Sequence, residues 1–76
     1  VVSAIATTER KIEIEALAAR AQGQTEREFR REVNGRGFIL RVGRRNGRPQ
    51  VGTRDFRRDR ITVQIDNGIV VTAVIG

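Results

Sequence analysis

The clearest alternation of hydrophobic and polar positions lies near the end of the chain. Residues 61–66 read Ile-Thr-Val-Gln-Ile-Asp, the period-two pattern of a strand with one buried face. Asn67 and Gly68 follow, a pair typical of a tight type I′ turn, and residues 69–75 are mostly apolar and β-branched. The pattern therefore predicts a C-terminal β-hairpin.

The first third of the chain has a helical pattern instead. Apolar residues recur there at i, i+3, i+4 and i+7, which is one face of a helix. These residues are Ile14, Leu17, Ala18 and Ala21. Thr7 or Thr8 can cap the N-terminus, so we predict a helix over about residues 9–21. Residues 11–15 alternate between charged side chains and Ile, so a strand starting there is the alternative.

A second helix is predicted after Gly23. Thr25 and Glu28 have the spacing of a capping box, and Phe29 and Val33 lie one turn apart on its apolar side. The sequence leaves open whether Gly23 separates two helices or lies inside one long helix, because a single Gly costs a helix only about 1 kcal/mol.

The middle of the chain is predicted to hold a short buried strand and a loop. Residues 38–42 form an apolar run bounded by glycines. Residues 43–51 have the Gly and Pro content of an exposed loop, although Asn46 and Gly47 also favour a tight hairpin turn. The expected elements come in the order helices first and strands afterwards. This order predicts an α+β fold, with an N-terminal helical segment packed on a small mixed sheet.

Composition limits the size of the core and the chemistry. Seventy-six residues with 38% hydrophobic residues allow one domain, whose core must consist mainly of Val, Ile, Leu and Ala because Trp, Tyr and Met are absent. The chain has no Cys and no His, so disulfides and the usual zinc ligand sets are excluded, and we expect neither metal nor cofactor. No apolar run approaches the length of about 20 residues that spans a bilayer.

The net charge of +6 favours an acidic partner. Nine Arg residues lie within residues 36–60, and Phe38 or Phe56 could stack on a base, so a nucleic-acid-binding domain is one candidate function. No nucleic-acid-binding motif is present, and Asp55 and Asp59 interrupt the basic run. An enzyme is not expected, since Ser3 is the only Ser and no imidazole or thiol is present.

Another candidate function comes from residues 53–66, Thr-Arg-Asp-Phe-Arg-Arg-Asp-Arg followed by the alternating strand. With the chain end Val-Ile-Gly, this stretch resembles the potato inhibitor I family of serine protease inhibitors and the small bacterial inhibitors that share its pattern. The resemblance extends over residues 23–76, which would be the inhibitor-like core of the single domain 1–76. Residues 1–22 would then be an N-terminal extension or an extra helix.

The resemblance implies an exposed loop that joins two parallel strands and enters a protease active site like a substrate. Arg54 would be the specificity residue and Arg54–Asp55 the reactive bond, with Arg60 tying Thr53 and Asp55 to the scaffold. The flanking residues would be Val51, Gly52, Thr53 and Phe56, and the supporting residues Arg57, Arg60 and Gly76. The implied partner is a trypsin-like or subtilisin-like serine protease, and the implied location is secreted or periplasmic.

Two departures from the family pattern bear on the loop. Thr62 stands where members often carry a second tethering Arg, so a looser hold is expected. Residues 43–52 are a few residues longer than the family's loop. Residues 1–6 are compatible with the remainder of a cleaved signal sequence, and no feature indicates an oligomeric state.

Overall fold

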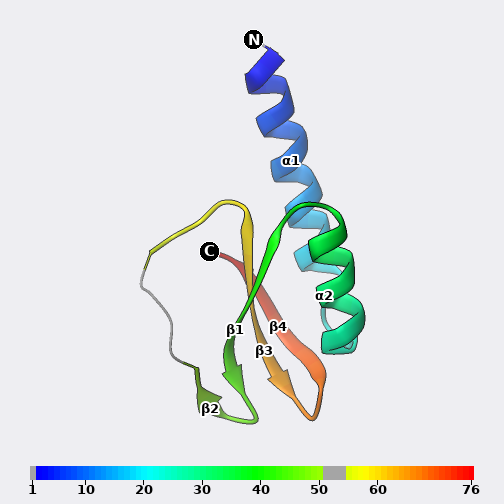
Figure 1. The fold of residues 1–76 in the computed structure, drawn as a ribbon, viewed down its shortest axis with the longest axis vertical. Helices are drawn as coiled ribbons and strands as arrows, with labels where there is room; N and C mark the ends of the chain where they lie inside the picture. Colours follow the sequence, from blue (N-terminus) through cyan, green and yellow to red (C-terminus); the bar gives the residue numbers. More distant parts are fainter. Residues whose placement is uncertain (1, 51–54) are drawn as a thin grey trace.

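The protein is a small α+β domain with two helices and a four-stranded mixed sheet (Figure 1). The computed structural model describes residues 2–50 and 55–76, with side chains from residue 9 onward. The elements are α1 (Val2–Ala19), α2 (Glu26–Gly35), β1 (Ile39–Arg45), β2 (Arg48–Pro49), β3 (Arg60–Asp66) and β4 (Ile69–Ile75). The strand order is β2-β1-β3-β4, in which β1 and β3 are parallel and the outer pairs antiparallel. The predicted fold class is confirmed.

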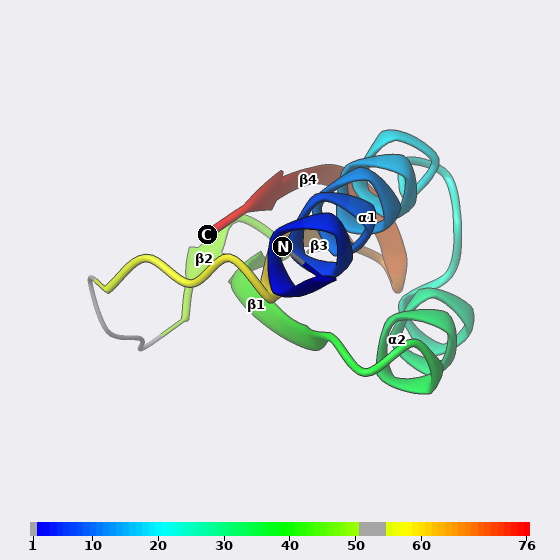
Figure 2. The same cartoon turned by 90° about the horizontal axis from the view of Figure 1, so that it is seen from above.

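The two faces of the sheet have different coverings. Both helices lie on one side, and residues 55–59, which lead into β3, lie on the other (Figure 2). Alternation along β3 directs Ile61, Val63 and Ile65 toward the helices, where all three are buried in the core. Arg60 and Thr62 consequently lie on the opposite face, where Arg60 contacts Asp55.

Both Asn-Gly pairs form tight turns. Asn46 and Gly47 have φ of 51° and 77°, and Asn67 and Gly68 have φ of 52° and 78°, the left-handed backbone that a type I′ turn requires. The first pair joins β1 to β2, so the described part of this stretch, residues 43–50, forms a hairpin and not an open loop. The backbone N–H of Asn67 donates to Asn46 Oδ1 at 2.8 Å and ties the two turns together.

The boundaries of the first helix differ from the prediction of residues 9–21. The helix begins at Val2, because the threonines that were expected to cap it are tolerated within a helix. It ends at Ala19, after which Arg20 and Ala21 make tighter bonds to the carbonyls three residues back. The strand alternative for residues 11–15 is wrong. Gly23, with φ of 90°, separates the two helices.

The predicted start of the second helix is confirmed. Thr25 is its N-cap, and the Thr25 hydroxyl accepts a hydrogen bond from the backbone N–H of Glu28 at 3.1 Å. Phe29 and Val33 are fully buried. In the described part of the chain, no helix is long and apolar enough to cross a membrane.

The first strand is longer than residues 38–42, because its pairing with β2 and β3 continues to Arg45. Its register with β3 shifts between Val42 and Arg44, and the shift leaves Gly43 as the extra residue. Before the shift, Arg41 lies opposite Thr62 on β3. The bulge thus determines which β1 side chains share a face with Arg60.

Candidate functional site

The connection between the parallel strands β1 and β3 is held at both described ends. On the β2 side, the backbone N–H of Gln50 donates to the carbonyl of Gly43 at 3.0 Å. On the β3 side, the chain returns through residues 55–59, which we call the returning limb. The carbonyl of Asp59 accepts a hydrogen bond from the backbone N–H of Ile39 at 2.9 Å. Four of the predicted site residues lie between these ends and outside the described residues. These are Val51, Gly52, Thr53 and Arg54.

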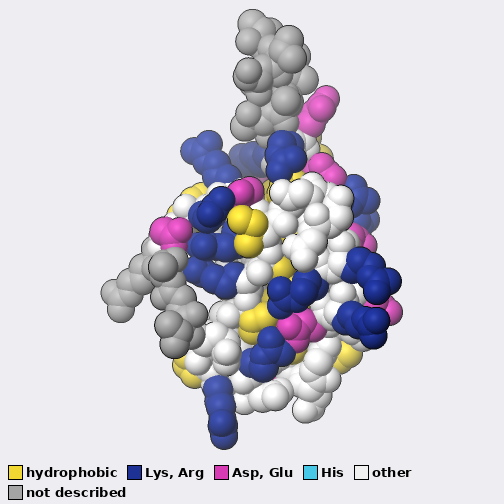
Figure 3. Space-filling model, viewed as in Figure 1, with side chains coloured by type: hydrophobic (Ala, Val, Ile, Leu, Met, Phe, Trp, Pro, Cys, Tyr) yellow, Lys and Arg dark blue, Asp and Glu magenta, His cyan; other side chains and the backbone are white. Residues whose placement is uncertain are grey.

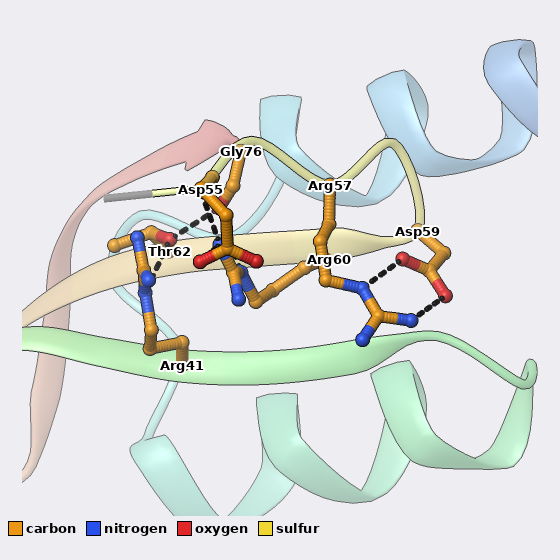
Figure 4. Close-up of polar contacts among 7 residues, drawn as sticks. All are labelled: Arg41, Asp55, Arg57, Asp59, Arg60, Thr62 and Gly76. Carbon is orange, nitrogen blue, oxygen red and sulfur yellow. Dashed lines mark hydrogen bonds and ion pairs between the residues drawn. The ribbon is translucent and has the colours of Figure 1, made fainter. Parts of the chain in front are cut away.

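Arg60 lies at the centre of the described part of the site, with only 7% of its surface exposed (Figure 4). It is the first residue of β3, and its side chain lies on the face away from the core. Its Nε donates to the carbonyl of Gly76 at 3.0 Å, and a terminal nitrogen donates to the carbonyl of Asp55 at 2.7 Å. That nitrogen also lies 3.6 Å from the Asp55 carboxylate. One guanidinium therefore links the returning limb to the end of β4.

Gly76 is joined to β3 by more than Arg60. Its backbone N–H donates to the carbonyl of Arg60 at 2.9 Å, which continues the β3–β4 ladder. Its carbonyl also accepts from the Thr62 hydroxyl at 2.7 Å. The Phe56 ring lies beside Gly76, where a Cβ on that residue would be 3.5 Å from it, an ordinary van der Waals contact. Phe56 itself remains 68% exposed.

Arg41 is a member of this cluster that the sequence reasoning missed. Its Nε donates to the Thr62 hydroxyl at 3.2 Å from the neighbouring strand (Figure 4). One sequence signal was available: Leu40 and Val42 alternate with Arg41, so a strand that buries them directs Arg41 to the opposite face. The position opposite Thr62, however, depends on the register of the parallel pair.

Arg57, expected among the loop supports, contacts a different partner. Its guanidinium makes two 3.0 Å hydrogen bonds to the Asp59 carboxylate. These bonds lower the pKa of Asp59 below its ordinary value. The Arg57 side chain is 47% exposed. Arg57 therefore braces the returning limb internally, whereas Arg60 ties the limb to the sheet.

A cleft of about 630 Å³ lies between α1 and the returning limb. Apolar side chains of Ile14, Phe38 and Phe56 line it together with charged ones such as Lys11 and Arg58. The Arg10 guanidinium lies 4.5 Å from the centre of the Phe38 ring, a cation–π contact. Among the described residues, no group of three or more Asp, Glu, His or Cys side chains is placed to hold a metal ion.

Comparisons with protein-family models, with curated proteins and with solved structures found no significant match. The resemblance to potato inhibitor I therefore remains a prediction from the residues.

Proposed function

We propose that this protein is a substrate-like inhibitor of serine proteases, which presents the connection between β1 and β3 as its reactive loop. The observation that carries the proposal is the buried side chain of Arg60, which donates to the carbonyls of Asp55 and Gly76. A long side chain held in this way on a rigid strand preorganises the segment it contacts, and a preorganised loop loses little entropy when it docks.

The anchor supports the proposed reactive bond because of where it acts. Cleavage between Arg54 and Asp55 would create a new amine on Asp55, the residue whose carbonyl Arg60 holds. On the other side, Gln50 is bonded to Gly43. The new amine end would thus stay close to its original position, which favours resealing of the bond over release.

Arg54 supplies the proposed specificity. A long cation at this position suits the pocket of trypsin-like enzymes, which has an acidic group at its base. A subtilisin-like protease is the second candidate partner. In either case the protease would bind the loop as it binds a substrate and turn it over slowly.

The test is titration of trypsin, chymotrypsin and subtilisin with the intact protein, followed by measurement of residual activity. We expect trypsin to be inhibited more strongly than chymotrypsin. Arg54→Ala should abolish trypsin inhibition and leave the midpoint of thermal unfolding nearly unchanged, because a single loop side chain contributes little packing. Negligible inhibition of all three proteases, or equal inhibition by Arg54→Ala, would contradict the proposal.

A further inference from the structure

The carbonyl of Gly76 accepts hydrogen bonds from two side chains of β3. Arg60 Nε approaches it at 3.0 Å and the Thr62 hydroxyl at 2.7 Å. A carbonyl oxygen has two lone pairs, so these two donors saturate it. The position of this oxygen therefore fixes one edge of the Arg60 guanidinium, and with it the direction in which the other edge reaches Asp55.

The direction of the Thr62 hydroxyl bond is determined by its neighbours. A hydroxyl has one proton, and Thr62 directs it to Gly76 because a carbonyl can only accept. Its lone pairs then accept from Arg41 Nε, which can only donate. The result is a chain of bonds from Arg41 through Thr62 and Gly76 to Arg60 and on to Asp55. The bond from Arg41 polarises the Thr62 hydroxyl and strengthens the bond that this hydroxyl donates to Gly76. Beyond Gly76 the link is positional, because the same oxygen accepts from Arg60.

Gly43 makes this rotamer of Thr62 possible. A Cβ on Gly43 would lie 2.9 Å from the γ2 methyl of Thr62, closer than carbon atoms pack. Gly43, at the bulge in β1, thus leaves space for the methyl group. The methyl and the hydroxyl oxygen of Thr are attached to the same Cβ, so the rotamer that places the methyl in this space also fixes the position of the oxygen. The hydroxyl is directed to Gly76.

We propose that Arg41 and Thr62 are positioning residues of the loop, which act at a distance by orienting the Gly76 carbonyl and the Arg60 guanidinium. Neither residue needs to touch the protease for this role. The inference rests on the proposed inhibitory function for its biological meaning, but the chain of hydrogen bonds can be tested without a protease.

The variants are Thr62→Val, which keeps the methyl and removes the hydroxyl, Arg41→Ala, and the double variant. Arg44→Ala is the matched control, because Arg44 lies on the same strand, is exposed and makes no side-chain hydrogen bond or ion pair within the described residues. With trypsin, each single variant should weaken inhibition about 3- to 10-fold and speed cleavage after Arg54. The double variant should inhibit trypsin as well as the more strongly impaired single variant does, since both substitutions break the same chain of hydrogen bonds.

A second measurement follows the Arg60 Nε proton by NMR, which reports the chain of bonds directly. We expect this proton to exchange faster with solvent in Thr62→Val and Arg41→Ala, and at the parent rate in Arg44→Ala. If the parent protein inhibits trypsin but the Arg60 proton is unaffected in both variants, the positioning role is overturned and the inhibitory function stands. Additive losses in the double variant, or an equal loss in Arg44→Ala, would also overturn it. If exchange changes as expected but the parent does not inhibit, only the inhibitory function fails.

Discussion

A buried guanidinium must find acceptors for its desolvated donors, since an unpaired charge in the protein interior costs several kcal/mol. Arg60 finds them on two segments that are far from one another in sequence, the returning limb and the end of β4. An aliphatic residue here would pack in the same place but would hold neither segment. The position of Arg60 is thus better explained by the loop than by the core.

Arg60→Ala should release the loop from the sheet, because it removes both hydrogen bonds. A hydrogen bond from a charged group contributes about 1.5–3 kcal/mol, so the variant should inhibit trypsin about 10- to 100-fold more weakly and be cleaved faster at Arg54–Asp55. Inhibition constants and mass spectrometry of the cleaved loop would measure both effects. Arg58→Ala, which removes the same charge two residues earlier in the chain, is the control and should behave like the parent protein. A parent-like Arg60→Ala would show that Arg60 does not hold the loop in a functionally relevant way.

At the residue scale, sequence alone gave part of this site. Asp55, Arg60 and Gly76 could be grouped beforehand because the resemblance assigns them related roles, and the structure brings them into contact. Arg41 could not be grouped with them. Its approach to Thr62 depends on the register of two parallel strands, which the hydrophobic pattern does not specify across a long connection.

At the scale of elements, Glu26 ties the start of α2 to the end of β1. Arg45 makes two hydrogen bonds to its carboxylate, one of them 2.9 Å long, and Arg30 adds a third at 3.0 Å. The bonds from Arg45 are the main reason that the pKa of Glu26 falls to about 2, from an ordinary value of 4.5. Arg45 reaches Glu26 because the bulge at Gly43 turns its side chain to the helix face, opposite Ile65.

The lowered pKa predicts a dependence of stability on pH. Because the pKa of Glu26 is lower in the folded than in the unfolded state, its stabilising effect is present above about pH 5 and is lost as the pH falls toward about 2. Urea unfolding at pH 6 and at pH 2.5 should show a smaller loss of stability in Glu26→Gln than in the parent. Glu28→Gln, in the same helical turn but without contact to Arg45, is the control. If the parent and Glu26→Gln lost the same amount of stability between pH 6 and pH 2.5, this linkage would be ruled out.

The first helix belongs to the folded domain and is more than an appended segment. Its residues Ile14 and Leu17 are almost completely buried in the core that also holds side chains of α2 and β3. Leu17→Ala should therefore lower the free energy of unfolding by about 2–5 kcal/mol, the cost of removing a buried aliphatic side chain. Ile12→Ala is the matched control, because Ile12 is 62% exposed and should change stability by less than about 0.5 kcal/mol. Equal effects in urea unfolding would mean that α1 does not pack on the sheet.

Elements were easier to predict than their ends. The Asn67-Gly68 turn, the Thr25 N-cap and the alternating strand each carry a local chemical reason for their structure, and all three form as predicted. Of the predicted capping box, the described residues show the bond from the Glu28 N–H to the Thr25 hydroxyl and not the reciprocal one. The start of α1 was wrong because threonine both caps helices and is tolerated within them. The choice between loop and hairpin after Gly43 was open because it depends on pairing with β1, which is a tertiary contact.

At the scale of the whole molecule, the positive charge is dispersed. Figure 3 shows Lys and Arg side chains over the viewed face with Asp and Glu among them. Several arginines of the basic run are already paired with carboxylates of the protein itself. These pairs are Arg36 with Glu13, Arg45 with Glu26, Arg57 with Asp59 and Arg60 with Asp55. A phosphate backbone would have to compete with these internal partners for the same guanidinium groups.

The dispersed charge leads to a prediction that separates the inhibitor from the nucleic-acid-binding alternative. Binding that relies on phosphate contacts weakens as the salt concentration rises. The logarithm of the affinity falls linearly with the logarithm of the salt concentration, and the slope grows with the number of phosphates contacted. Because several arginines of the basic run already pair with carboxylates of the protein, we expect binding to duplex DNA or RNA to be weak at about 50 mM salt and lost by about 150 mM. Fluorescence anisotropy with labelled oligonucleotides of two unrelated sequences would measure this. A complex that survives at about 150 mM and prefers one sequence would require a surface specific for bases, and it would favour the alternative over protease inhibition.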